Sequence, residues 1–211
     1  TENAYQFGAV YLNKDAKTVN ELSKEILYQE FLDNIIALSQ QNIGGSTDLT
    51  PIVKLTEEIK NTEPNGRVVI DLLNDSTIDL YSVKEGDELF VPETNNVVYV
   101  YGEISSEGAV MFSENQGVDY FVDKSGGFKK FADRESIYIL HPNGESQLYR
   151  SKRNIFENRP KSEMQIYPGS IIFVPRALDD SAPRRLAAQA YVSILGNLGI
   201  ALASLSAIND D

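Results

Sequence analysis

Two stretches with the same order of residue types constrain the fold of this chain most strongly. Residues 83–92 contain a Gly, then an apolar run, then Val-Pro, and residues 166–175 repeat that order. This order is typical of a turn followed by a strand that stops at the proline. Upstream, residues 5–10 resemble residues 99–104, because in each an aromatic run leads into a Gly. We therefore expect two related units, although chance similarity between short apolar strands is the alternative.

The second unit has the alternation of a small α+β domain. Residues 97–101 are β-branched and aromatic, which is typical of a strand. Gly126-Gly127 would end a short helix that contains Val118 and Phe121. The expected strands are residues 97–101, 109–112, 137–140, 147–149 and 171–174, with the helix between the second and the third. This order of strand–strand–helix–strand–strand–strand is that of a β-grasp.

The first unit would carry a helical insertion. Apolar residues recur at helical spacing over residues 19–37. They are Leu22, Ile26, Leu27, Phe31 and Ile35. A second helix is expected over residues 51–59, with Thr50 as its N-cap and Pro51 in its first turn. A strand is expected at residues 66–72, and we expect the two helices to decorate the unit rather than to carry chemistry.

Residue types that most catalytic and metal sites require are scarce. The chain has no Cys, and His141 is its one His, which excludes thiolate sites and common zinc sites within these residues. His141 stands beside the hairpin signal Pro142-Asn143-Gly144, so we expect it to be exposed in a turn. No phosphate-binding loop, calcium loop or nucleophile elbow occurs. We expect no enzymatic activity, no catalytic residue, no metal and no cofactor.

The charges fall in blocks along the chain. Its net charge is −12, which disfavours generic binding of nucleic acid. Residues 1–93 hold 17 acidic and 7 basic residues, whereas residues 148–185 hold 8 basic and 4 acidic residues. The acidic unit would then face the basic stretch of a neighbouring copy, with Arg150, Lys152 and Arg153 as possible inter-subunit residues. The alternative is that these charges are simply solvated.

Residues 187–208 contain no charged side chain. A helix of this length would be roughly 33 Å long at about 1.5 Å per residue, enough to cross the core of a bilayer. Placed at about 100° per residue, its large apolar side chains share one face, which would contact lipid. They are Tyr191, Ile194, Leu195, Leu198, Leu202 and Leu205. The polar side chains gather on the other face and are Gln189, Ser193, Asn197 and Ser204.

A ring of such helices would give the side chains of this polar stripe hydrogen-bond partners. The amides of Gln189 and Asn197 need hydrogen-bond partners in hydrocarbon, and a wet lumen would supply them. Arg184 and Arg185 would then lie at the level of the lipid headgroups. The alternative is an amphipathic helix that docks on the chain's own soluble domain.

Several of these runs resemble one known family. Residues 98–104, 108–110, 119–121 and 125–127, with the closing residues 168–175, resemble the soluble-ligand-binding β-grasp (SLBB) domain. SLBB domains occur in outer-membrane polysaccharide exporters, and the helices inserted into the first unit resemble the capsule-exporter branch of that family. The family's N-terminal export domain, its signal peptide and its lipidated Cys are not found in these residues, so we expect a part of a longer protein.

The resemblance implies an α+β fold with two tandem β-grasp (SLBB) domains, residues 1–95 and 96–177, followed by a transmembrane amphipathic helix over residues 183–208. It implies a non-enzymatic subunit of a channel in the bacterial outer membrane, with periplasmic domains, that passively conducts capsular polysaccharide or exopolysaccharide. The implied partners are further copies in a homo-oligomeric ring, the polysaccharide, outer-membrane lipid, and an inner-membrane or periplasmic export component. The alternative function is a soluble periplasmic carbohydrate-binding β-grasp module whose terminal helix packs on its own domain.

Overall fold

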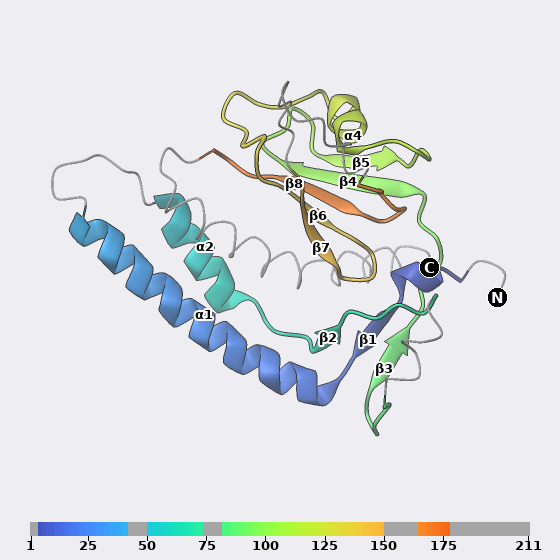
Figure 1. Cartoon of the computed structure of the whole chain (residues 1–211), viewed down its shortest axis with the longest axis horizontal. Helices are drawn as coiled ribbons and strands as arrows, with labels where there is room; N and C mark the ends of the chain where they lie inside the picture. The colour runs from blue at the N-terminus through green and yellow to red at the C-terminus, as the bar shows by residue number, and fades with distance from the viewer. Residues whose placement is uncertain (1–3, 42–49, 74–81, 150–163, 178–211) are drawn as a thin grey trace, which may run out of the picture.

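The computed structural model describes residues 4–41, 50–73, 82–149 and 164–177. These residues form an α+β fold with a three-stranded sheet and a five-stranded sheet. Figure 1 shows α4 on one face of the five-stranded sheet, and the long helices α1 and α2 side by side near the three-stranded sheet.

The five-stranded sheet has the strand order β5-β4-β8-β6-β7. Its elements are β4 (Val97–Gly102), β5 (Gly108–Met111), α4 (Val118–Lys124), β6 (Ile137–Leu140), β7 (Ser146–Tyr149) and β8 (Ile171–Val174). β4 and β8 are parallel, with Val100 opposite Ile172, and the other pairs are antiparallel. The first and last strands of the unit therefore lie side by side in the centre, which is the topology of a β-grasp. All five strands and the helix lie where the sequence predicts them.

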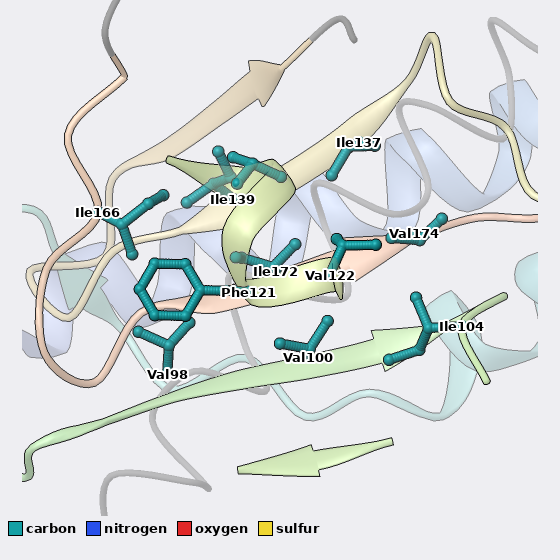
Figure 2. Packing of buried hydrophobic residues seen from close by; sticks show 11 residues of the cluster. Val98, Val100, Ile104, Phe121, Val122, Ile137, Ile139, Ile166, Ile172 and Val174 are labelled. Atoms are coloured by element: carbon teal, nitrogen blue, oxygen red, sulfur yellow. The ribbon is translucent and has the colours of Figure 1, made fainter. Parts of the chain in front are cut away.

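The core of this unit lies between the sheet and α4. Val98 and Val100 are fully buried on β4, whereas the alternate residues Tyr99 and Tyr101 lie on the opposite face, as the period of a strand requires. Figure 2 shows Phe121 of α4 among side chains that come from the sheet. Burial of each large apolar side chain contributes about 1.5–3 kcal/mol, so this cluster is the main source of stability in the unit.

The three-stranded sheet has the order β2-β1-β3. Its strands are β1 (Val10–Leu12), β2 (Arg67–Val68) and β3 (Glu88–Phe90), and both pairings are antiparallel. The expected strand at residues 66–72 is thus only two residues long, and these two residues pair with Leu12 and Tyr11 of β1. The expected opening strand that ends in Gly8 is wrong, since Gln6–Gly8 is a short 3-10 helix (η1) and the strand starts after it.

The two units differ in how their first and last strands pair. Val10 of β1 pairs with Phe90 of β3 in the antiparallel sense, whereas Tyr99 of β4 pairs with Ile171 of β8 in the parallel sense. The described part of residues 5–92 therefore does not repeat the topology of the second sheet. The two glycines also differ in place, because β1 starts after Gly8 whereas β4 ends at Gly102.

The two closing stretches do share a local structure. The turns at residues 84–87 and 167–170 each have a Gly with positive φ in third place, +87° at Gly86 and +82° at Gly169. In each, the fourth residue donates its backbone N–H to the carbonyl of the first, at 3.1 and 3.0 Å. Its side-chain oxygen accepts the backbone N–H of the first residue in return, at 2.8 and 3.1 Å. The correspondence between these stretches is therefore real at the level of the turn and strand.

The two long helices are α1 (Lys14–Gln41) and α2 (Thr50–Asn61). Asn13 caps α1, because its Oδ1 accepts the backbone N–H of Ala16 at 2.9 Å. Lys24 of α1 donates from Nζ to the carbonyls of Lys60 and Thr62, at 3.0 and 3.1 Å. A cation at the C-terminal end of a helix is stabilising, so this contact ties the end of α2 to α1.

The apolar residues of α1 lie on two faces. Phe31 is fully buried, as is Ile59 of α2, whereas Leu22 and Ile26 are 64% and 61% exposed. The helical spacing correctly predicts a helix, but it does not distinguish the buried face that contains Phe31 from the exposed face that contains Leu22 and Ile26.

Candidate functional site

The site residues predicted from the sequence lie outside the described residues. They fall at positions 150–153 and 184–205, and the structure describes neither stretch. In the described part of the chain, no helix combines the length and hydropathy that crossing a membrane requires. No group of three or more His, Cys, Asp or Glu residues gathers there at metal-binding distance.

Three loops meet where the parallel strands β4 and β8 end. The first loop is residues 102–106, which start at the last residue of β4, and the second is residues 175–177 after β8. The third is residues 126–134, which lie between α4 and β6. Together we call these three loops the loop platform. Backbone hydrogen bonds join the three loops to one another. They are Ser105 N–H to Gly127 O (2.9 Å), Lys129 N–H to Glu103 O (2.9 Å), Asp133 N–H to Pro175 O (2.8 Å) and Ala177 N–H to Phe131 O (2.7 Å). Backbone hydrogen bonds between the loops fix the positions from which their side chains extend.

The loop platform presents basic and aromatic side chains together. The guanidinium carbon of Arg176 lies 4.7 Å from the ring centroid of Phe131, and Nζ of Lys130 lies 5.2 Å from the same centroid. The guanidinium of Arg134 lies 4.7 Å from the ring of Phe128. Exposed cation–π contacts contribute about 0.5–1 kcal/mol each, which helps to order these long side chains. Lys129 is exposed on the same loop.

The carboxylates of the loop platform are less accessible than its cations. Asp133 is only 6% exposed, and its Oδ1 accepts the backbone N–H of Glu135 at 2.9 Å. Glu103 faces Arg176 at 3.8 Å, with side chains 23% and 55% exposed respectively. Two carboxylates next to these loops are exposed: Glu135, and Glu107, whose Oε1 accepts the backbone N–H of Gly102 at 3.3 Å. The surface offered to solvent is therefore mainly cationic, although the chain as a whole is acidic.

Sequence analysis missed the loop platform. We interpreted Gly126-Gly127 only as the stop of a helix, and did not consider the run from Phe128 to Arg134. That run alternates Phe with Lys and Arg, a signal that could have been recognised. The contribution of Arg176 could not, because a distant segment brings it to Phe131.

A second feature is the junction between the two sheets. The ring of Phe7 in η1 lies 4.1 Å from the ring of Tyr167, centroid to centroid. The hydroxyl of Tyr5 donates to the carbonyl of Pro168 at 3.0 Å. Arg67 of β2 donates from Nη2 to the carbonyl of Pro142 in the β6–β7 turn. Burial lowers the pKa of Arg67 to about 10, which still leaves the guanidinium charged at neutral pH. Its hydrogen bond to Pro142 links β2 to the β6–β7 turn.

His141 belongs to this junction, and the expectation that it is exposed is wrong. It is 2% exposed, and its ring lies 5.3 Å from the ring of Tyr167 and 6.5 Å from that of Phe7. Its Nδ1 is 3.3 Å from the hydroxyl of Ser170. Burial lowers the pKa of His141, while Gln147 and the charge of Glu145 act in the opposite direction. The turn is covered by the first unit, and the local sequence contains no sign of that contact.

Comparisons with known proteins point to polysaccharide transport. No protein-family model matches the chain. Two curated proteins from Escherichia coli do match, each named polysialic acid transport protein KpsD, with 24% identity over 117 residues in both cases. Over these residues the chain is similar to proteins of a polysaccharide export family. Each match covers 56% of this chain and 20% of the relative, so the chain spans only a part of those proteins' length. The resemblance to this family that the strand-Gly motifs indicate is thereby confirmed.

Proposed function

We propose that this chain is part of a polysaccharide export protein that forms a passive conduit across the bacterial outer membrane. The observation that carries the proposal is the similarity to polysaccharide transport proteins over 117 residues. The β-grasp sheet supports it, because the topology is the one that the SLBB resemblance implies. Sugar polymer would pass through without any bond being made or broken.

The exposed edge of the first sheet supports assembly into a homo-oligomeric ring. β3 is an edge strand with all three residues exposed, and Leu89 and Phe90 are 56% and 45% exposed. An edge strand that offers apolar side chains and free backbone groups is a ready partner for another chain. A closed ring needs head-to-tail contacts between unlike surfaces, and the fixed junction would give every copy the same angle. An export component of the inner membrane or periplasm would complete the pathway.

The proposal is tested by the assembly state of the full-length protein. After detergent extraction, electron microscopy should show closed rings. Monomers would contradict the conduit and favour the alternative, a soluble periplasmic carbohydrate-binding module.

The membrane segment is proposed separately, because residues 187–208 lie outside the described residues. Since the chain has no Cys, single cysteines can be introduced without background. A membrane-impermeant thiol reagent on intact cells should label positions 193 and 197 and leave 198 and 202 protected. Equal protection of all four positions would contradict a lumen lined by the polar stripe.

A further inference from the structure

We propose that the loop platform is a binding site for acidic polysaccharide. Lys129, Lys130 and Arg134 would bind carboxylates carried by the sugar units, and Phe131 would stack on an apolar face of a sugar ring. The inference deepens the proposed function and rests on it, since it names the chemical class of the exported polymer.

The first step of the argument is the rigidity of the site. Residues 102–106, 126–134 and 175–177 are joined by backbone hydrogen bonds of 2.7–2.9 Å, so the loops need no ordering when a ligand binds. The platform also lies at the carboxyl ends of two parallel strands, β4 and β8.

The second step concerns charge. Four cations are exposed here, namely Lys129, Lys130, Arg134 and Arg176, against two exposed carboxylates, Glu107 and Glu135. Asp133 is buried and Glu103 is mostly covered, so the exposed charge is positive on balance. These four cations come from a chain with 19 Lys and Arg residues against 31 Asp and Glu residues. An acidic polymer would be repelled by most of this molecule and attracted here, so charge complementarity selects the surface.

The third step concerns the aromatic ring. Phe131 is 49% exposed, and the cations of Arg176 and Lys130 lie 4.7 and 5.2 Å from its ring centroid. A ring flanked by cations suits a ligand that offers apolar C–H groups and carboxylates close together, as an acidic sugar does. An exposed ring of this kind has no role in the core of the unit, because the Phe121 cluster fills that core without it.

The test is binding of a defined acidic glycan to the full chain. Isothermal titration calorimetry would compare purified oligogalacturonate with a neutral maltooligosaccharide of the same length, at low and at physiological ionic strength. We expect the acidic glycan to bind, the neutral glycan to bind far more weakly, and added salt to reduce the affinity. The double variant Lys130→Ala/Arg134→Ala should lose roughly five- to tenfold in affinity.

Matched controls separate the site from general charge. Lys54→Ala/Lys60→Ala removes the same charge from α2, and should bind like the unmodified chain. Lys130→Arg/Arg134→Lys keeps the charge of the platform, and should retain most of the affinity. Phe131→Leu should weaken binding without altering its dependence on salt.

Several results would overturn the proposal. They are no binding of oligogalacturonate, equal binding of the neutral glycan, or equal affinity in the two double alanine variants. Capture of the chain by phosphatidylglycerol vesicles without binding of the glycan would assign the surface to a membrane instead. If the glycan does not bind while the full-length protein still forms rings, the proposed conduit is supported and the proposed binding site is contradicted. If rings do not form while the variants of the loop platform lose affinity for the glycan, the proposed binding site is supported and the proposed conduit is contradicted.

Discussion

Gly102 ends β4 with a φ of +98°, and a Cβ at this position would lie 2.1 Å from the carbonyl oxygen of Val174. Gly8, which the sequence aligns with it, has no such φ, and its Cβ would instead meet the ring of Tyr5 at 2.5 Å. The first glycine permits a backbone conformation next to the parallel partner strand, and the second leaves room for a side chain at the junction. The same residue type therefore meets two different physical requirements.

Gly102→Ala should destabilise the chain by about 2 kcal/mol or more, because a left-handed backbone and a clash with backbone both oppose a Cβ. Gly117→Ala is the matched control, since nothing lies within 4 Å of its Cβ and its φ is −91°. We expect that control to cost less than about 1 kcal/mol. Urea unfolding followed by circular dichroism would measure both, and equal losses would contradict the close approach to Val174.

The stability of the chain should depend on His141 below about pH 6.5. Burial favours the neutral ring, so the folded state binds fewer protons than the unfolded state and loses stability as the pH falls. The loss attributable to this group is at most about 1.4 kcal/mol at pH 5.5. His141→Gln should reduce the difference in free energy of unfolding between pH 7.5 and pH 5.5 relative to the unmodified chain.

The same histidine can be followed directly by NMR. As the chain has one His, its ring protons give an unambiguous titration curve. The groups near the His141 ring that carry or can gain a charge are Tyr167, Glu145 and Arg67. Arg67 belongs to β2, and its guanidinium binds the carbonyl of Pro142 in the adjoining turn. A pKa at or above the value of an exposed histidine would contradict the burial at the junction.

At the scale of the element, α1 is a helix that packs with only part of its apolar surface. Phe31 of α1 and Ile59 of α2 are both buried, whereas Leu22 of α1 is 64% exposed. The spacing of apolar residues predicts the helix whether those residues are buried or exposed, because both kinds contribute to the same helical period. Which set packs depends on where α2 and the sheet lie, and that is not a local property.

Phe31→Ala should destabilise the chain by about 3–4 kcal/mol, because it leaves a cavity at a fully buried position of α1. Leu22→Ala should change stability by less than about 0.5 kcal/mol, because the side chain has little contact to lose. Thermal and urea unfolding would measure the two variants side by side. A large loss for Leu22→Ala would mean that its face of α1 is covered, for example by another copy.

At the scale of the whole molecule, the junction fixes how the two units are oriented. It combines the contact between the tilted rings of Phe7 and Tyr167 with hydrogen bonds from Tyr5 and Arg67. The buried end of Arg67 packs closely over Gly144, where a Cβ would lie 2.7 Å from Nε. A subunit of a ring needs such a constant angle, since small errors would accumulate from copy to copy.

Arg67→Met should loosen this junction, because Met keeps the apolar stem but loses the charge and the donor to Pro142. Spin labels at the exposed positions Ser23 and Met111, introduced as cysteines, would report the distance between the units. We expect one narrow distance distribution in the unmodified background and a broader one with Arg67→Met. Lys54→Met on α2 is the control, and an equal width in all three proteins would show that the aromatic contacts hold the units without Arg67.

The sequence by itself determined the elements of the second unit and their β-grasp order. The β-branched and aromatic residues at 97–101 and 137–140, a glycine stop after α4 and the turn at Pro142 are local signals, and each acts within a few residues. It also determined the resemblance to polysaccharide exporters. Only the tertiary structure decided the antiparallel pairing of β1 with β3, the burial of His141 and the assembly of the loop platform. These depend on contacts between segments far apart in the chain, whose free energy comes from excluding water between surfaces that no local pattern identifies.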